Sequence, residues 1–294
     1  MKAPAFDYIK PKTLEAAFAT LAQYGDEAQL LAGGQTLLAT LNMRLSEPTI
    51  LIDINGIAAL RGISITDGGK VLRIGALTTH TQIEDSNLIK AHAPLLSLAA
   101  PHIAHRAIRN LGTFGGSIAY ADPAAEWPTC LIALNGTIVV RGPTGERRID
   151  ADQFFTDLYT TALAPGEIIV ACDIPVRRST GIAVFDELAR RHGDYAICGL
   201  AITGMYESDQ LSDARVVYLG IGTTPIRARQ SEALLQSALL STDLIDKVQQ
   251  TLKLELNPLS DLTNSSATKK HLATVLAKRL LTSLLTNHAN TLPN

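Results

Sequence analysis

The chain of 294 residues is poor in cysteine. Its three cysteines, Cys130, Cys172 and Cys198, are far apart in the sequence and form no C-x-x-C pair. Because an iron–sulfur cluster usually needs four thiolates, this chain cannot hold one alone. The cysteines are better explained as three small buried hydrophobic residues in a protein of a reducing compartment.

The sequence also has almost no excess of charge and no long apolar run. The formal net charge is -2, and Lys and Arg are scattered, so no basic nucleic-acid face is expected. No apolar run approaches the ~20 residues that a membrane-spanning helix needs. Met1–Pro4 lack the charged-then-apolar start of a signal peptide. We therefore expect a soluble, cytoplasmic protein without a membrane span.

Signature motifs of several enzyme classes are absent. The sequence contains no G-x-x-x-x-G-K-[ST], G-x-G-x-x-G or G-x-S-x-G motif, and Gly220–Pro225 fails as a dinucleotide fingerprint because Pro225 occupies the third glycine position. His102 and His105 could share a helix face, but no Asp, Glu or Cys lies near them in sequence to complete a metal site. We therefore predict neither a catalytic acid–base set nor a metal site.

Hydrophobic residues make up 46% of the sequence, enough for a substantial core. In the first part of the chain, a helix capped by Thr13 and strands at 29–32 and 49–54 predict a β-α-β-type unit. Further strands are predicted at 71–76, 137–141, 146–149 and 168–174, with a helical stretch over 79–108. Gly142–Gly145 is typical of a hairpin turn.

The pattern changes after about residue 180. Three consecutive strands are predicted at 182–189, 196–206 and 214–222, and three helices at 229–240, 243–255 and 267–285. Strands followed by helices are typical of an α+β domain. The predicted domains are residues 1–176, with subdomains at about 1–56 and 57–176, then residues 177–286 and a tail at 287–294. The boundary is placed near Pro175–Thr180, where Arg177–Ser179 are polar.

A first glycine-bearing segment, Ala32-Gly33-Gly34-Gln35-Thr36, joins a predicted strand to a predicted helix. The two glycines allow close backbone approach to a ligand, and the helix N-terminus leaves amides that suit a diphosphate. The hydroxyl of Thr36 can add a donor. Taken alone, however, this motif is better explained as an ordinary strand-to-helix turn, because short glycine motifs often occur by chance.

A second segment, Arg109–Ser117, contains three glycines in five positions: Gly112, Gly115 and Gly116. Together with the polar side chains of Thr113 and Ser117, such a loop can surround a phosphate or a flat polar ring with backbone donors. The alternative is a tight surface loop, which explains the density of donors less well.

Two carboxylates and one tyrosine are further candidates. Asp122 and Glu126 could accept hydrogen bonds from ribityl or ribose hydroxyls. Alternatively, Asp122 is a helix N-cap followed by Pro123, with Glu126 near the fourth helical position. Tyr195 follows the polar stretch Arg190–Asp194 and could lie over a flavin ring, or it could be a strand tyrosine in the core.

Together these motifs resemble the FAD-binding medium subunit of the molybdenum hydroxylases, the family of carbon monoxide dehydrogenase, nicotine dehydrogenase and bacterial xanthine dehydrogenase. The resemblance rests on Ala32–Thr36 and Thr113–Ser117, in the family's order and near its spacing. Further stretches agree: 41–53, 75–80, 122–126, 190–195 and 222–228. The chain departs from the family at Thr268-Lys269, where Tyr-Arg is usual, and at Thr36, where Ser is more frequent.

The resemblance implies an α+β architecture, with a vanillyl-alcohol-oxidase-type (PCMH) FAD-binding domain followed by a smaller α+β C-terminal domain. It implies that FAD is held mainly through backbone amides to the pyrophosphate, with Tyr195 beside the isoalloxazine ring. The FAD-binding residues carried over are Ala32, Gly33, Gly34, Gln35, Thr36, Thr113, Gly115, Gly116, Ser117, Asp122, Glu126 and Tyr195.

The resemblance also implies partner subunits. A large subunit would carry molybdopterin cytosine dinucleotide and a small subunit two 2Fe-2S clusters, in a heterotrimer that often dimerises. The expected function is electron transfer from the clusters through FAD to an external acceptor. A self-contained flavin oxidase and a scaffold that has lost FAD are the alternatives. The substrate is set by the large subunit and is left open between carbon monoxide, an N-heterocycle and an aldehyde.

Overall fold

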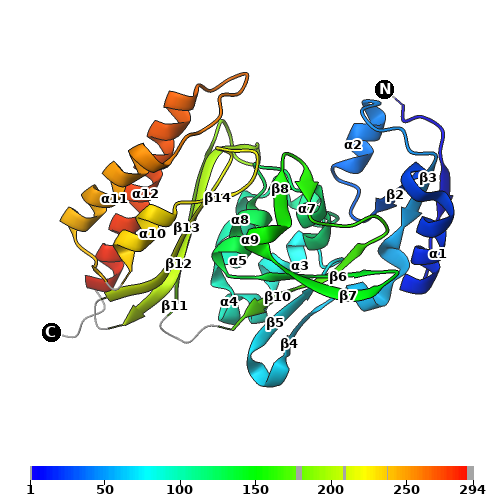
Figure 1. Ribbon diagram of the computed structural model, residues 1–294, viewed down its shortest axis with the longest axis horizontal. Coiled ribbons are helices and arrows are strands. Elements are labelled where there is room, and N and C mark those ends of the chain that lie inside the picture. Colours follow the sequence, from blue (N-terminus) through cyan, green and yellow to red (C-terminus); the bar gives the residue numbers. More distant parts are fainter. Residues whose placement is uncertain (1, 177–180, 208–209, 237, 290–294) are drawn as a thin grey trace.

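The computed structural model describes residues 2–176, 181–207, 210–236 and 238–289 (Figure 1). The predicted polar boundary at Arg177–Ser179 therefore lies outside the described residues, as do residues 290–294 of the predicted tail. Within the described ranges, no helix has both the length and the apolar character to cross a membrane.

The N-terminal part contains a three-stranded parallel sheet of order β1-β3-β2. Its strands are β1 (Asp7–Ile9), β2 (Ala28–Leu31) and β3 (Ile50–Asp53), and its helices are α1 (Leu14–Tyr24) and α2 (Leu37–Asn42). Thr13 caps α1 by accepting a hydrogen bond from the amide of Ala16 at 3.2 Å. The predicted β-α-β arrangement is confirmed. Strand β1 was not predicted, because its three residues are all exposed and leave no apolar pattern.

A five-stranded antiparallel sheet of order β4-β5-β10-β6-β7 follows. Its strands are β4 (Ile63–Thr66), β5 (Val71–Gly75), β6 (Thr137–Gly142), β7 (Gly145–Asp150) and β10 (Ile168–Pro175). All except β4 were predicted, and Gly142 pairs with Gly145 across the expected hairpin. A small two-stranded sheet comprises β8 (Phe155–Asp157) and β9 (Thr160–Thr161).

The predicted helical stretch over 79–108 is divided into short helices. They are α3 (His80–Asp85), α4 (Asn87–His92), α5 (Pro94–Ala99) and α6 (Arg106–Arg109), with the 3-10 turn η5 (Ala100–His102). The stretch is interrupted because Ser86 caps α4 and Pro94 begins α5. The helices α7 (Phe114–Tyr120), α8 (Glu126–Ala133) and α9 (Ala151–Phe154) complete this part.

The C-terminal part is a sheet covered by helices. The sheet runs in the order β11-β12-β13-β14, with β15 beside β13. Its strands are β11 (Gly181–Ala189), β12 (Ala196–Glu207), β13 (Gln210–Leu219), β14 (Ile226–Arg227) and β15 (Ala238–Leu239). Its helices are α10 (Arg229–Leu235), α11 (Thr242–Glu255) and α12 (Ser266–Ala289). The third strand ends three residues earlier than predicted, because Gly220 turns the chain with φ of 78°.

The two faces of this sheet pack against different hydrophobic cores, and this packing connects the two parts of the chain. Ala201 and Val217 belong to the core of the N-terminal part, whereas Leu200 and Val216 belong to the core under α11 and α12. Neighbouring residues of a strand point to opposite faces, so one sheet serves two cores. Figure 1 shows α10–α12 on the outer face of the sheet and α5 and α8 on the inner face.

Candidate functional site

The two glycine-bearing segments lie against each other. A Cβ built on Gly33 would be 2.3 Å from the carbonyl oxygen of Leu111 and 2.8 Å from Cα of Gly112. A Cβ built on Gly116 would be 3.8 Å from the Cβ of Ala32. Only glycine at position 33 permits this backbone contact, because any side chain there would overlap the neighbouring carbonyl. The fold therefore brings the two predicted segments together.

The first segment presents main-chain donors. Gly34 has φ of 70°, and the side chain of Gln35 donates to the carbonyl of Gly33 at 3.0 Å. Asn55 Nδ2 donates a hydrogen bond to the carbonyl of Ala32 at 2.6 Å. Among the described residues, no hydrogen bond uses the amides of Gly33, Gly34, Gln35 or Thr36, and the Thr36 hydroxyl makes no cap bond to α2. Four consecutive amides before a helix are an arrangement that binds anions.

The second segment differs from the expectation, because its amides are used within the chain. Thr113 caps α7 by accepting from the Gly116 amide at 3.2 Å, and its carbonyl accepts from the Ser117 amide at 3.1 Å. The Gly115 amide donates to the carbonyl of Ala76 at 2.8 Å, and a Cβ on Gly115 would lie 2.5 Å from the Cβ of Ala76. Thr113 and Gly115 therefore hold α7 against the end of β5. The described structure leaves the Ser117 hydroxyl available to a ligand.

The alternative assignment of Asp122 as a helix N-cap is wrong. Helix α8 begins at Glu126 with Ala125 as its N-cap. Asp122 instead stabilises the turn before the helix, since its Oδ1 accepts from the Ala124 amide at 2.9 Å. Burial raises the pKa of Asp122. Burial, and secondarily the charge of Glu187, raises the pKa of Glu126 to about 8.

Tyr195 lies in the turn between β11 and β12 with 66% of its surface exposed, so the alternative of a core tyrosine is wrong. Partial desolvation raises the pKa of Tyr195, and the nearby Asp122 and Tyr120 add to this effect. The rings of Tyr120 and Tyr159 are 5.1 Å apart. Three exposed tyrosine rings from both parts of the chain, Tyr120, Tyr159 and Tyr195, thus lie near Asp122, and such rings can flank a planar ligand.

His80 and Trp127 form a buried hydrogen-bonded pair that packs against the second segment. The sequence did not indicate this pair. The amide of His80 donates to the carbonyl of Gly112 at 3.0 Å, and His80 Nδ1 accepts from Trp127 Nε1 at 2.9 Å. Burial, with the charge of Arg109, lowers the pKa of His80 to about 4, so its ring is neutral at pH 7. A Cβ on Gly112 would lie 2.6 Å from His80 Nε2. No local sequence signal distinguishes this histidine from the others.

The other histidines and the cysteines of the described residues are not gathered into a metal-binding group. His102 ends η5, and His105 precedes α6 as its N-cap, so they share no helix face. In the ranges that the structure describes, no group of three or more His, Cys, Asp or Glu side chains could hold a metal ion. All three cysteines are free and buried, as expected from the sequence.

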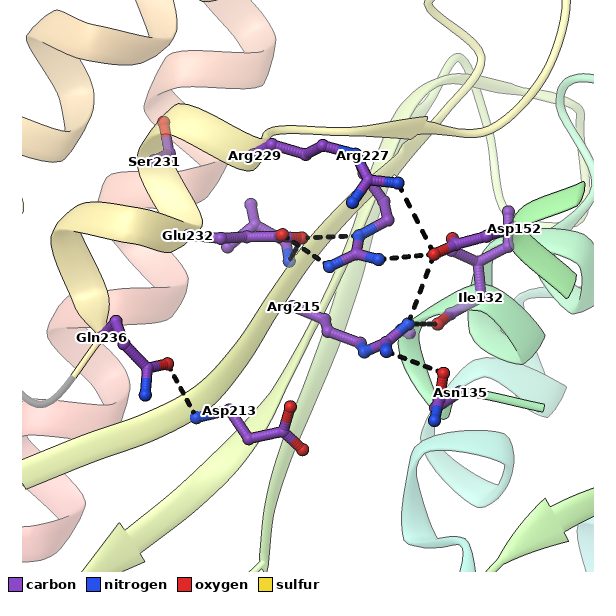
Figure 2. Close-up of polar contacts among 12 residues, drawn as sticks. Ile132, Asn135, Asp152, Asp213, Arg215, Arg227, Arg229, Ser231, Glu232 and Gln236 are labelled. Carbon is purple, nitrogen blue, oxygen red and sulfur yellow. Dashed lines mark hydrogen bonds and ion pairs between the residues drawn. The ribbon is translucent and has the colours of Figure 1, made fainter. Parts of the chain in front are cut away.

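Two hollows of about 320 and 160 Å³ lie away from the predicted site. They flank a network in which Asp152 of α9 meets three arginines of the C-terminal part (Figure 2). Arg227 donates to Asp152 at 2.5 Å, while the nearest guanidinium nitrogens of Arg215 and Arg229 lie 3.7 and 3.6 Å away. Arg227 is also paired with Glu232 at 2.7 Å, so its charge is balanced within the chain. These ion pairs connect the N-terminal part of the chain with the C-terminal part.

The predicted residues fit a flavin dinucleotide. Unpartnered amides suit the diphosphate, the glycines at 33 and 116 allow the two segments to pack closely, and Asp122 can accept from sugar-type hydroxyls. Tyr195 provides an aromatic ring near Asp122. Positively charged side chains are not part of this arrangement, because a helix N-terminus and free amides can bind a diphosphate without them.

Comparisons with known proteins identify the family of the chain. Residues 4–177 match the family described as the FAD binding domain in molybdopterin dehydrogenase, and residues 183–284 match the C-terminal domain of the carbon monoxide dehydrogenase flavoprotein. The chain is 38% identical over 286 residues to the 6-hydroxypseudooxynicotine dehydrogenase complex subunit alpha of Paenarthrobacter nicotinovorans, covering 97% of this chain and 96% of that protein. It is 34% identical to the caffeine dehydrogenase subunit beta of Pseudomonas sp. (strain CBB1), covering 96% and 95%.

A solved structure supports the same assignment. The chain resembles carbon monoxide dehydrogenase from Hydrogenophaga pseudoflava, in a form that lacks the Mo-pyranopterin moiety of its molybdenum cofactor. The TM-score is 0.91 at 34% identity, covering 95% of this chain and 96% of the other. The expected fold, a FAD-binding domain followed by an α+β C-terminal domain, is confirmed. The chain belongs to the family of FAD-binding subunits of the molybdenum-containing hydroxylases and dehydrogenases.

Proposed function

We propose that this chain transfers electrons within a heterotrimeric molybdenum hydroxylase, receiving them from iron–sulfur clusters of a small partner subunit and delivering them to an external acceptor. Substrate hydroxylation would take place at the molybdopterin cytosine dinucleotide of a large partner subunit. The observation that carries this proposal is the contact between the two glycine-bearing segments, Gly33 against Leu111, beside four unpartnered amides. Two such heterotrimers would form a dimer.

We assign the parts of the site by their chemistry. The amides of Gly33–Thr36 and the hydroxyls of Thr36 and Ser117 would hold the diphosphate. Asp122 and Glu126 would accept from hydroxyl or imide donors, and Tyr195 would lie beside the ring system. Ala32, Thr113, Gly115 and Gly116 would serve mainly by keeping the two segments in contact.

When bound, FAD would supply the chemistry of accepting and releasing one or two electrons. The chain's own residues would position it, exclude water from part of its surface and set the charge around it. No side chain of the site needs to act as an acid or base toward the substrate. This role fits the polar groups of the site, which are main-chain amides, hydroxyls and two carboxyl groups rather than a catalytic triad.

The free thiols of Cys130, Cys172 and Cys198 support a cytoplasmic location, where cysteines stay reduced. The substrate of the complex is a property of the large subunit. We therefore propose no substrate from this chain and expect that the pocket of the co-purifying large subunit identifies it.

Purification of the chain together with its partners tests the proposal. We expect a yellow protein whose flavin absorbance is bleached by substrate only when the large and small subunits are present. An isolated chain that is reduced directly by an alcohol or amine would favour the self-contained flavin oxidase. A colourless chain that binds no added FAD would contradict both and leave a scaffold role.

A further inference from the structure

The first glycine-bearing segment lies beside the turn that follows the neighbouring strand. Strands β2 and β3 are parallel, and Leu31 is opposite Asp53 at their carboxyl ends. The segment Ala32–Thr36 continues β2, and the 3-10 turn η2 (Ile54–Gly56) continues β3. Neighbouring parallel strands end at the same edge of a sheet, which is also the edge where ligands bind in open sheets of this kind. Residues of η2 can therefore act on the segment.

Asn55 of η2 connects this segment to a buried carboxylate. Its Nδ2 donates to the carbonyl of Ala32 at 2.6 Å and to Oδ1 of Asp53 at 2.8 Å, and its main-chain amide donates to the same Asp53 oxygen at 2.9 Å. Asp53 is 5% exposed, accepts from Tyr8 and pairs with Lys10 at 3.0 Å. Burial would raise the pKa of Asp53, but its hydrogen bonds outweigh burial and lower the pKa to about 2, so the carboxylate is ionised at neutral pH.

The partners of Asn55 fix the direction of its side-chain amide. Its Oδ1 accepts from Arg61 at 3.2 Å, and a guanidinium group can only donate. Its Nδ2 faces the carbonyl of Ala32 and the ionised carboxylate of Asp53, which can only accept. One orientation of the amide satisfies these partners. Aspartate has nearly the same shape but offers only acceptors when ionised, so it cannot replace Asn55 in these bonds.

Arg61 extends this connection toward the second glycine-bearing segment. Its Nη1 donates to the carbonyl of Leu77 at 3.3 Å. The neighbouring carbonyl of Ala76 accepts from the amide of Gly115 at 2.8 Å. Arg61 is exposed and its bonds are longer than those of Asn55, so we expect it to contribute less.

We propose that Asn55 is a positioning residue for the flavin diphosphate, because it fixes the carbonyl of Ala32 and thereby the amide of Gly33. This inference rests on the proposed function, in which the amides of Gly33–Thr36 bind the diphosphate. The carbonyl of Ala32 and the amide of Gly33 belong to one planar peptide group, so a bond that fixes the first also fixes the second. A hydrogen bond to the carbonyl also polarises the peptide group and strengthens its amide as a donor. Asp53 acts through Asn55.

Titration of the flavin-free chain with FAD tests this role. Asn55→Ala should weaken FAD binding about tenfold, because the amide of Gly33 loses its fixed direction and its polarising partner. Asn55→Asp keeps the shape of the side chain but sets an acceptor against the carbonyl of Ala32, so it should weaken binding at least as much. The absorbance spectrum of the bound flavin at saturation should be unchanged in both variants, since Asn55 acts on the diphosphate and not on the ring.

A double-mutant cycle tests the path from Asp53. Asp53→Asn removes the carboxylate that holds Asn55, so it should also weaken FAD binding, but less than Asn55→Ala. The double variant Asp53→Asn with Asn55→Ala should bind FAD as weakly as Asn55→Ala alone, because Asp53 has no further effect once Asn55 is removed.

Asp173→Asn is the matched control. Asp173 is also a buried carboxylate, and it pairs with Arg73 and Arg148 within the five-stranded sheet. The variant should be less stable in urea but should bind FAD with the affinity of the unmodified chain. A loss of affinity in Asp173→Asn equal to that in Asn55→Ala would overturn the proposal, since reduced stability alone would then explain both.

Three further results separate the remaining possibilities. Unchanged FAD affinity in Asn55→Ala, or in Asn55→Asp where Asn55→Ala does not fold, would overturn the role of Asn55 and leave the proposed function intact. Additive losses in the double variant would overturn the path from Asp53 through Asn55. An unmodified chain that binds no FAD would contradict the proposed function, and the role of Asn55 with it.

Discussion

The ammonium nitrogen of Lys269 lies 2.7 Å from the carbonyl oxygen of Gly220, and the amide of Gly220 donates to the carbonyl of Pro123 at 2.8 Å. Lys269 is buried and also pairs with Asp261 at 2.8 Å. Two hydrogen bonds thus connect α12, at the far end of the chain, with the turn that carries Asp122. The Thr268-Lys269 departure from the family's usual Tyr-Arg therefore keeps a cation at a position where it holds the turn.

Lys269→Met should loosen this connection. The variant leaves the Gly220 carbonyl and Asp261 without their donor, so we expect a loss of about 1–3 kcal/mol in the free energy of unfolding and weaker FAD retention. Urea unfolding and flavin content measure the two effects. Lys269→Arg should retain most of both, and Lys270→Met, which changes a lysine with no bonded partner among the described residues, should change neither. If Lys269→Met keeps full flavin content at reduced stability, the connection is structural only.

Asp152 should be important for joining the domains, because three arginines of the C-terminal domain converge on it (Figure 2). We expect Asp152→Ala to lower the free energy of unfolding by about 1–3 kcal/mol, since Arg227 loses a hydrogen-bond acceptor and Arg215 an ion-pair partner, and both arginines are largely buried. Arg229 is 67% exposed at 3.6 Å, so Arg229→Ala should cost less than about 0.5 kcal/mol. Chemical denaturation of both variants checks the ranking, and equal losses would contradict it.

His80 should make the protein sensitive to acid. Its pKa is lowered to about 4 in the folded chain and is about 6.5 when unfolded, so the unfolded state takes up a proton first as the pH falls. The neutral ring of His80 therefore contributes its full share to the free energy of unfolding above pH 6.5. Between pH 6.5 and pH 4 this free energy falls by about 3 kcal/mol. Unfolding experiments at pH 7, 5 and 4 measure this loss. His80→Gln, which can still accept from Trp127, should reduce the pH dependence; an unchanged dependence would contradict the assignment.

The hydroxyls of Thr36 and Ser117 should contribute to FAD affinity without supporting the fold. Neither hydroxyl has a partner among the described residues, so Thr36→Val with Ser117→Ala should leave stability nearly unchanged. Two lost hydrogen bonds of about 1 kcal/mol each predict roughly tenfold to hundredfold weaker FAD binding. Titration of the flavin-free chain with FAD measures the affinity, with Ser64→Ala on an exposed strand position as the control.

Gly33→Val should act differently from the double variant Thr36→Val with Ser117→Ala. The added side chain would meet the Leu111 carbonyl before it met any ligand, so it should separate the two segments and lower both stability and FAD affinity. Circular dichroism melting and flavin content distinguish the two classes of variant. A Gly33→Val chain with normal stability and normal flavin content would remove the contact from the description of the site.

Several elements could be predicted from local patterns. The capped helix after Thr13, the hairpin at Gly142–Gly145 and the strand that ends at Ala189 follow from caps, turns and apolar runs that act over a few residues. Strand β4 (Ile63–Thr66) escaped prediction because a short, half-exposed strand gives little periodicity. The alternative of a helix start at Asp122 was wrong because Asp122-Pro123 satisfies a cap pattern that the chain uses for a turn instead.

The sequence by itself determined the mixed α+β composition and the two glycine-bearing segments, since these depend on residue type and local spacing. Only the tertiary structure decided that Gly33 contacts Leu111, that the amides of Phe114–Ser117 are already used, and that Lys269 reaches Gly220. These are contacts between residues far apart in sequence, and which donor meets which acceptor depends on how the sheets and helices pack.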